Sequence, residues 1–245
     1  MKQTFKNVVV LLSGGLDSST LAYLAAKESK SYLQNRVFIL TFDYGQRHKK
    51  ELECAKKISR EVGAVEHQVV KFDLTLWGGS SLTEKDKKVP QKRKLTDKSI
   101  PNTYVPARNT IFLSFALAYA EAINAEEIYI GVNSVDYSGY VDCRRPFINK
   151  FQELIKLATV AGVKGRVIKI KTPLMNLSKA GIVKLGKKLG VNWSLTWSCY
   201  LGGKKACGLC DSCQLRLKGF ALAGIKDPLK YKEFPPFYKI NLKKL

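Results

Sequence analysis

Five apolar runs of strand length alternate along this chain with segments of helical period. The runs occupy residues 8–12, 37–42, 65–72, 127–132 and 166–170. Between and after them, residues 17–29, 46–62, 109–124, 147–160 and 178–189 carry apolar side chains at three- and four-residue spacing. This alternation predicts a doubly wound α/β fold with a parallel five-stranded sheet covered on both faces. In such folds the functional loops follow the carboxyl ends of the strands.

Two segments interrupt this alternation. Residues 73–106 form a long polar excursion with two adjacent glycines and many lysines, which is typical of a lid. From Trp193 onward the chain carries clustered cysteines, a helical segment over residues 213–222 and a tail that contains prolines. We therefore predict an α/β catalytic domain over residues 1–192 and a small C-terminal appendage over residues 193–245.

The chain is strongly basic, with 42 Lys and Arg against 20 Asp and Glu and a formal net charge of +22. Such a charge attracts polyanions, so nucleic acid is a candidate partner. The lysines are nevertheless scattered, and no aromatic platform for single strands is interleaved with them. We favour a solvated surface that attracts small anionic substrates, and we do not expect direct tRNA binding.

Hydrophobic segments are short throughout the sequence. No run approaches the roughly 20 apolar residues of a membrane span. The first apolar run is too short for the core of a signal peptide and lacks a cleavage site of small residues. We expect a cytoplasmic protein without a membrane partner.

A glycine loop joins the first strand to the first helix; it consists of Ser13, Gly14, Gly15, Leu16, Asp17, Ser18 and Ser19. Glycines let backbone N–H groups turn inward and the helix N-terminus adds partial positive charge, which together make an anion site. The serines add donors, and Asp17 can cap the helix or hold Mg²⁺. The Walker lysine is missing, which argues against a GTPase or kinase of that class. We predict an ATP site formed by Leu12, Ser13, Gly14, Gly15, Leu16, Asp17, Ser18, Ser19 and Thr20; a plain turn with a helix cap is the alternative.

Four of the six cysteines follow the pattern Cys-x7-Cys-x2-Cys-x2-Cys; they are Cys199, Cys207, Cys210 and Cys213. Glycines between them permit the tight turns that bring four thiolates onto one ion. Tetrahedral Zn²⁺ fits this set and would be structural, because four thiolates leave no open position. An iron–sulfur cluster is the first alternative, although the closing Cys-x3-Cys-Pro of ferredoxins is missing, and a redox role of the thiols is the second. Cys54 lies in a helical segment and is expected to be a buried apolar residue.

Further polar residues lie beside predicted strands and helices. Asp43 and Gln46 follow the second strand, where doubly wound folds contact ribose or adenine; a helix cap at Asp43 is the alternative. Arg108 precedes an apolar helix and can bind a phosphate or carboxylate. The loop after the fourth strand, residues 131–140, combines donors, acceptors, aromatic faces and a carboxylate, which suits a planar base. A polar surface loop is the alternative there.

These motifs together resemble a known family. The glycine loop is similar to that of the pyrophosphatase-loop (PP-loop) ATPases, which have an adenine nucleotide alpha hydrolase-like fold. Within that superfamily the chain resembles the 7-cyano-7-deazaguanine synthases over residues 7 to 217. The matching segments besides the loop are residues 42–48, 105–109, 136–140 and 197–200.

The resemblance implies an ATP-dependent ligase that converts 7-carboxy-7-deazaguanine and ammonia to the 7-nitrile. The acid and then the amide are adenylated, and AMP and diphosphate are released. The product would serve the biosynthesis of the tRNA nucleosides queuosine or archaeosine. ATP and Mg²⁺ would be cofactors, and structural Zn²⁺ would occupy the four matching cysteines. The sequence leaves oligomeric state open, with a homodimer among the options.

We assign site residues on this basis. The catalytic candidates are Asp17, Ser18, Arg108 and Asp136. The substrate-binding candidates are Asn133, Asp136, Tyr137, Tyr140 and Arg144. A PP-loop tRNA-thiolating enzyme remains an alternative, because it would share the ATP loop and use cysteines for sulfur transfer. A non-catalytic zinc-bearing nucleic-acid-binding protein would explain the charge and the cysteines but not the glycine loop.

Overall fold

The computed structural model describes residues 4–30, 33–97, 99–133 and 139–238. A sheet of five parallel strands lies at its centre in the order β4-β3-β1-β5-β6, which confirms the predicted fold class. These strands are β1 (Thr4–Leu11), β3 (Leu33–Asp43), β4 (Glu66–Lys71), β5 (Glu127–Tyr129) and β6 (Lys169–Lys171). A short strand that the sequence did not predict, β2 (Ser29–Lys30), pairs antiparallel with the start of β3.

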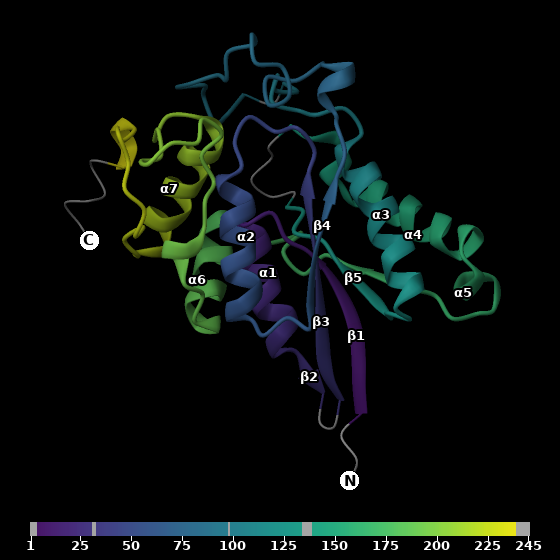
Figure 1. Cartoon of the computed structure of the whole chain (residues 1–245). Helices are drawn as coiled ribbons and strands as arrows, with labels where there is room; N and C mark the ends of the chain where they lie inside the picture. Colours follow the sequence, from purple (N-terminus) through teal and green to yellow (C-terminus); the bar gives the residue numbers. More distant parts are fainter. Residues whose placement is uncertain (1–3, 31–32, 98, 134–138, 239–245) are drawn as a thin grey trace.

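Helices cover both faces of this sheet (Figure 1). One face carries α1 (Leu16–Lys27), α2 (Lys50–Glu61), α6 (Lys179–Leu189) and α7 (Asp211–Ala223). The other carries α3 (Arg108–Ala122), α4 (Arg145–Ala158) and the single turn α5 (Val160–Val163). Three 3₁₀ turns complete the described elements: η1 (Thr75–Trp77), η2 (Val141–Cys143) and η3 (Trp193–Leu195). None of these helices is long and apolar enough to cross a membrane.

The central strand β1 is apolar on both sides because it is covered on both sides. Val8, Val9 and Val10 have no exposed surface. Val8 and Val10 pack with α1 and α6, whereas Val9 packs with α3 and α4. A strand with two buried faces shows no polar alternation, which is why its sequence is a continuous hydrophobic run.

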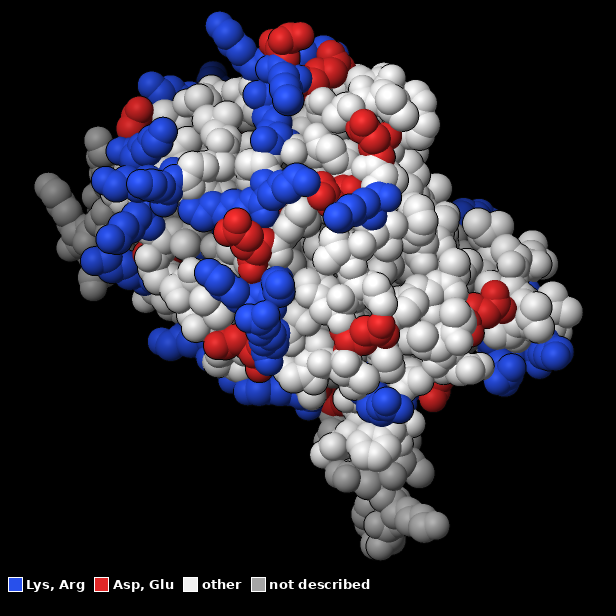
Figure 2. All heavy atoms as spheres, in the orientation of Figure 1, with Lys and Arg blue, Asp and Glu red and all other residues white. Residues whose placement is uncertain are grey.

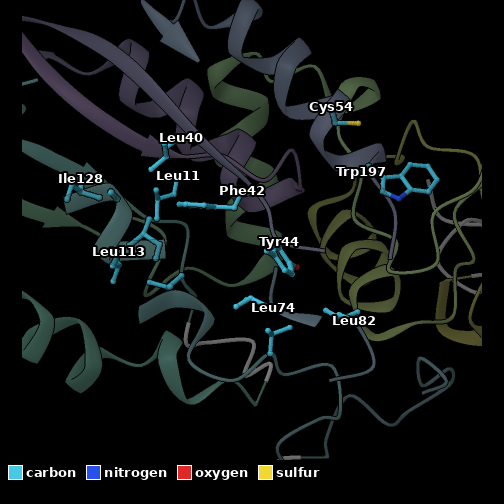
Figure 3. Close-up of a cluster of buried hydrophobic side chains, with 14 of the residues drawn as sticks. Leu11, Leu40, Phe42, Tyr44, Cys54, Leu74, Leu82, Leu113, Ile128 and Trp197 are labelled. Atoms are coloured by element: carbon cyan, nitrogen blue, oxygen red, sulfur yellow. The ribbon is translucent and has the colours of Figure 1, made fainter. Parts of the chain in front are cut away.

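The core extends from the sheet to the end of the molecule where β1 and β3 finish. Figure 3 shows Leu11, Leu40 and Phe42 close together, with Tyr44, Leu74 and Leu82 of the same apolar cluster below them in the view. The ring of Phe42 stacks on Phe112 of α3 at a centroid distance of 4.0 Å. The carboxyl end of the sheet therefore has a rigid apolar base from which polar loops project.

Residues beyond 192 pack into the same apolar clusters as the sheet. Trp193 and Phe220 join the cluster around α1 and α6, and Trp197 and Leu217 join the cluster around β1. The excursion over residues 73–106 is also attached to this region, since the Lys92 N–H donates to the carbonyl of Leu209 at 2.9 Å. The division into residues 1–192 and 193–245, and the role of the excursion as a lid, remain predictions.

A buried ion pair secures the C-terminal segment. The Arg216 guanidinium donates two hydrogen bonds to the Asp227 carboxylate, at 2.7 and 3.0 Å, and the two side chains are 2% and 0% exposed. Tyr231 donates to the same carboxylate at 2.6 Å, and Arg216 also donates to Thr196 Oγ1 at 2.7 Å. The pair thus links α7 to the chain on either side of it.

Replacing Asp227 with alanine should destabilise the fold by about 3–5 kcal/mol, because the Arg216 charge would be left buried without its partner. Urea unfolding followed by circular dichroism measures this change. Glu153→Ala is the matched control, since the Lys150–Glu153 pair is 79% and 58% exposed and should contribute less than about 1 kcal/mol. Equal effects of the two substitutions would contradict the structural role given to Asp227.

Candidate functional site

A cavity of about 310 Å³ opens at the carboxyl ends of the central strands. Its wall includes most of the glycine loop after β1 and residues 130–133 after β5. At the end of β3 and just beyond it, the wall contains Phe42, Tyr44, Gln46, Arg47 and His48. The first turns of α2, α3 and α6 also belong to the wall, as do Trp197, Ser198 and Tyr200 and, from α7, Ser212, Leu215 and Arg216. Ligands of doubly wound sheets bind in this position, where the loops of neighbouring strands diverge.

Gly14 brings the glycine loop into contact with α2. Its φ of +80° lies in the left-handed region, and a Cβ there would lie 2.7 Å from the Ala55 nitrogen and 2.9 Å from Cys54 Cβ. A larger residue would therefore separate the loop from α2. Cys54 itself is 8% exposed, which confirms the prediction that it is a buried residue.

The serines of the loop are held by one another. Ser13 Oγ and Ser18 Oγ lie 2.9 Å apart, and the Ser13 N–H donates to Ser18 Oγ at 3.2 Å. Helix α1 begins after Gly15 without a side-chain cap, so its first N–H groups are available to a ligand. Hydroxyl groups and a helix N-terminus thus meet on one side of the cavity, which suits a phosphate.

Asp17 lies in the first turn of α1 and forms an ion pair with Lys179. The Asp17 side chain is 24% exposed, and its Oδ1 atom is buried without a hydrogen-bond partner in the part of the chain that is described. A carboxylate oxygen in this state, beside serine hydroxyls, fits an Mg²⁺ that accompanies bound phosphates.

The sequence did not identify Lys179 as a site residue. It is the first residue of α6, lines the cavity, and is 16% exposed. The positive charge of a lysine at this position lies at the positive end of the helix dipole, and the two repel each other, so the charge destabilises α6. A lysine at the start of a predicted helix is therefore the sequence feature that could have indicated a role in the cavity.

Arg108 forms another charged part of the wall. It follows Ala107, which has a φ of +51° and is strained for a residue with a side chain. The guanidinium donates to Tyr44 Oη at 3.2 Å and lies 5.8 Å from the ring centres of Tyr44 and Tyr140. Burial lowers the pKa of Arg108, but the nearby tyrosines raise it above its usual value, so the residue stays a cation.

Glu51 is a further cavity residue that the sequence did not identify. It lies in the first turn of α2, partly buried, with Gln46 and Arg108 beside its carboxyl group. Burial raises the pKa of Glu51 to about 7, although the Arg108 charge and the Gln46 hydrogen bond oppose this shift. In the sequence Glu51 follows closely on the polar segment 42–48, which begins at the end of β3, and this closeness is the feature that could have identified it.

The structure brings many of the predicted site residues to the cavity wall; these are Leu12, Ser13, Gly15, Leu16, Asp17, Ser18, Gln46, Arg108, Asn133 and Tyr140. Those described but outside the wall are Gly14, Ser19, Thr20, Asp43 and Arg144. Asp43 pairs with Lys49 at 2.9 Å, and Arg144 is exposed. Asp136 and Tyr137 lie outside the described residues. The roles assigned to all of these residues remain predictions.

Cys143 also lines the cavity. Burial raises the pKa of its thiol to about 12, and the nearby Asp142 acts in the same direction. A thiol in this state stays protonated at neutral pH and is a poor nucleophile.

The four clustered cysteines come together, as predicted, next to the start of α7. All their sulfur atoms lie within 4.8 Å of one another, and Cys207 Sγ and Cys213 Sγ are 3.8 Å apart. Tetrahedral Zn²⁺ with Zn–S bonds of about 2.3 Å requires sulfur separations of about 3.8 Å. Backbone N–H groups of Leu201 and Cys207 point to Cys199 Sγ at 3.4 and 3.3 Å, which favours a thiolate. The cluster could therefore hold zinc.

The cluster is connected to the cavity through the chain that precedes it. The carbonyl of Cys199 accepts hydrogen bonds from His48 Nε2 at 2.8 Å and from Trp197 Nε1 at 3.0 Å. The backbone N–H of Trp197 donates to the carbonyl of Gly14 at 2.9 Å. A metal ion on the cysteines would thus stabilise the position of one wall of the site.

Known proteins resemble this chain over almost its whole length. The family model described as "Queuosine biosynthesis protein QueC" matches residues 7–224. The 7-cyano-7-deazaguanine synthase of Nostoc sp. is 55% identical over 225 residues, which cover 91% of this chain and 96% of that protein. The enzyme of the same name from Trichormus variabilis is 56% identical, covering 91% and 97%. That from Clostridium kluyveri is 51% identical, covering 93% and 98%.

Metal analysis tests the cysteine cluster. We expect about one zinc per chain by mass spectrometry, and near zero in a Cys210→Ser variant, which should also unfold at lower temperature because a ligand is lost. Cys54→Ser is the control, since Cys54 lies outside the cluster and its removal should leave the zinc in place. Iron with acid-labile sulfide in place of zinc would contradict the zinc assignment.

Proposed function

This chain belongs to the family of the queuosine biosynthesis protein QueC, and from that membership we propose that it makes 7-cyano-7-deazaguanine from 7-carboxy-7-deazaguanine and ammonia. In this proposal ATP activates the acid, and AMP and diphosphate are released. The product feeds the biosynthesis of deazaguanine-modified tRNA nucleosides.

One observation supports this chemistry most strongly. The glycine loop and the half-buried cation Arg108 line the same cavity of about 310 Å³, which lies within the size range of small-molecule sites. An anion site for ATP and a second cation for the acid must be close together if the acid is to attack the α-phosphate.

The wall divides into two parts in this proposal. The first N–H groups of α1 and the hydroxyls of Ser13 and Ser18 bind the phosphates, and Lys179 neutralises the charge of the departing diphosphate. Asp17 would hold Mg²⁺, which would reduce the negative charge of the phosphates. Arg108 binds the substrate carboxylate, since a guanidinium can donate two parallel hydrogen bonds to it.

The reaction requires two activations. A carboxylate oxygen attacks the α-phosphate and diphosphate leaves; ammonia then attacks the acyl carbon and AMP leaves with that oxygen. The amide oxygen attacks the α-phosphate of a second ATP and diphosphate leaves. Loss of two N–H protons and of AMP, which carries that oxygen, then gives the nitrile. Asn133 and Tyr140 would contact the deazaguanine, together with Asp136 and Tyr137 of the same loop. Arg144 would need to move toward the cavity to contribute.

The remaining assignments follow from the same proposal. Zinc on the four cysteines is structural, because four thiolates fill its coordination sphere. None of these cysteines lines the cavity, which disfavours direct sulfur transfer by a tRNA-thiolating enzyme. A cytoplasmic location and small-molecule substrates without tRNA fit this role, and a homodimer is retained as an option.

The basic surface fits anionic substrates. On the face in Figure 2, Lys and Arg side chains gather over the part of the molecule that contains α2, α6 and α7. Helices α1, α2 and α6 also contribute to the cavity wall. A positive field around the cavity raises the local concentration of ATP and of the acid.

A product assay tests the proposed reaction. The protein is supplied with ATP, Mg²⁺, ammonium and 7-carboxy-7-deazaguanine, and the base is followed by mass spectrometry and the nucleotide by chromatography. We expect the nitrile together with AMP. An unchanged base, or ADP as the nucleotide product, would contradict the proposal.

Lys179→Ala should reduce kcat/KM for ATP by about 10²–10³-fold, because a preorganised charge beside the phosphates is lost. Steady-state kinetics at varied ATP measure the effect. Lys184→Ala, on the exposed side of the same helix, is the matched control and should retain normal kinetics. A Lys179→Ala variant with unchanged kcat/KM would remove this residue from the phosphate site.

A further inference from the structure

The proposed binding of ATP and acid gives no role to Glu51, an acid in the wall of the cavity. Glu51 lines the cavity but belongs neither to the glycine loop nor to the loop after β5. Its carboxyl group is partly buried, and an acid is rarely buried unless it is paired or functional.

Glu51 lies between the two sites of the proposed reaction. A Cβ on Gly14 would collide with the Glu51 carbonyl, so the first turn of α2 packs directly on the glycine loop. The Glu51 carboxyl group is near Arg108 and Gln46, both of which favour its charged form. A carboxylate held by Arg108 and attacking a phosphate at the glycine loop would therefore place its carbon near Glu51.

The steps that involve ammonia require a proton acceptor close to the acyl carbon. At neutral pH most ammonia is ammonium, which has no lone pair and cannot attack the acyl carbon. Nitrile formation from the adenylated amide then requires the loss of two N–H protons. Both steps are faster when a positioned group receives the proton.

We propose that Glu51 is the general base for the ammonia-dependent steps. This inference rests on the proposed function and adds a catalytic residue to it. Glu51 removes a proton from bound ammonium, giving ammonia and a neutral carboxylic acid. Ammonia forms the C–N bond, AMP leaves with the carboxyl oxygen, and the excess proton passes to solvent. In the second half, Glu51 accepts N–H protons one at a time, while the C–O bond to AMP breaks and the nitrile forms.

The protonation states around Glu51 agree with this role. The titratable groups that interact with Glu51 are Arg108 of α3 and Tyr44 after β3. The other charged or titratable residues of the cavity wall are Asp17, Arg47, His48, Tyr140, Cys143, Lys179, Tyr200 and Arg216. Burial raises the pKa of Tyr44 to about 12, so this residue stays protonated, and Arg108 stays a cation. With its own pKa raised by burial to about 7, Glu51 can both accept and release a proton at neutral pH.

The alternative role for Glu51 is recognition of the base, because a carboxylate can accept hydrogen bonds from the N–H edge of a guanine-like ring. The two roles differ in the step that they affect. A base-binding residue is needed before the first adenylation, whereas a general base for ammonia is needed only afterwards.

Glu51→Gln separates the two roles. Acid-dependent exchange of labelled diphosphate into ATP, measured without ammonium, reports only the first adenylation. We expect the variant to retain this exchange within about twofold, and to form nitrile about 10²-fold or more slowly than wild type at pH 7. The deficit should shrink toward pH 9 at fixed total ammonium, because free ammonia then becomes available without a base. Glu53→Gln, exposed on the same helix, should match wild type in every assay.

Loss of exchange in Glu51→Gln, or a deficit that is the same at pH 7 and pH 9, would overturn the role of Glu51. The pH dependence of the wild-type protein gives an independent measurement. At saturating ammonium, the rate of nitrile formation should rise with pH, with a midpoint near pH 7, while the rate of diphosphate exchange should not. Absence of that rise would also overturn it. Absence of exchange and nitrile in the wild type would instead contradict the proposed function.

Discussion

The close packing of three chain segments on Gly14 is the contact on which the site depends. The left-handed φ of Gly14 turns the glycine loop, its missing side chain admits α2, and its carbonyl accepts the Trp197 N–H at 2.9 Å. Strand β1, helix α2 and the chain leading to the cysteine cluster therefore meet at one residue. Each contributes a different part of the chemistry: a phosphate site, Glu51, and a wall secured by the cluster.

The charged residues of the structure have different roles: some stabilise the fold and others border the cavity. Arg216 and Asp227 form a fully buried pair with several further hydrogen bonds, which secures the C-terminal segment. The pairing of Asp17 with Lys179 is more exposed and borders the cavity, so a bound phosphate or cation can replace it. Arg108 contacts the Tyr44 hydroxyl and faces the rings of Tyr44 and Tyr140. The Glu51 carboxyl group is also near it, but burial raises the pKa of Glu51 to about 7, so this acid is only partly ionised at neutral pH and neutralises the Arg108 charge only in part.

The sequence predicted the sheet and the helices well because buried strands and amphipathic helices have distinct periods. It did not predict β2, since a two-residue strand has no period to detect. The glycine loop and the cysteines were found because their residues are close in sequence. Lys179 and Glu51 were not, because only the fold brings α6 and α2 to the glycine loop. The burial that sets the pKa of Glu51 likewise depends on residues far away in the chain.

The central claim is that this cavity transfers AMP to the oxygen atoms of an acid and then of an amide. Substrate labelled with ¹⁸O at both carboxylate oxygens tests this directly, with mass spectrometry of the AMP formed. The account predicts one ¹⁸O in each AMP, because both oxygens leave the base on the α-phosphate before the nitrile is complete. AMP without label, formed together with the nitrile, would contradict it.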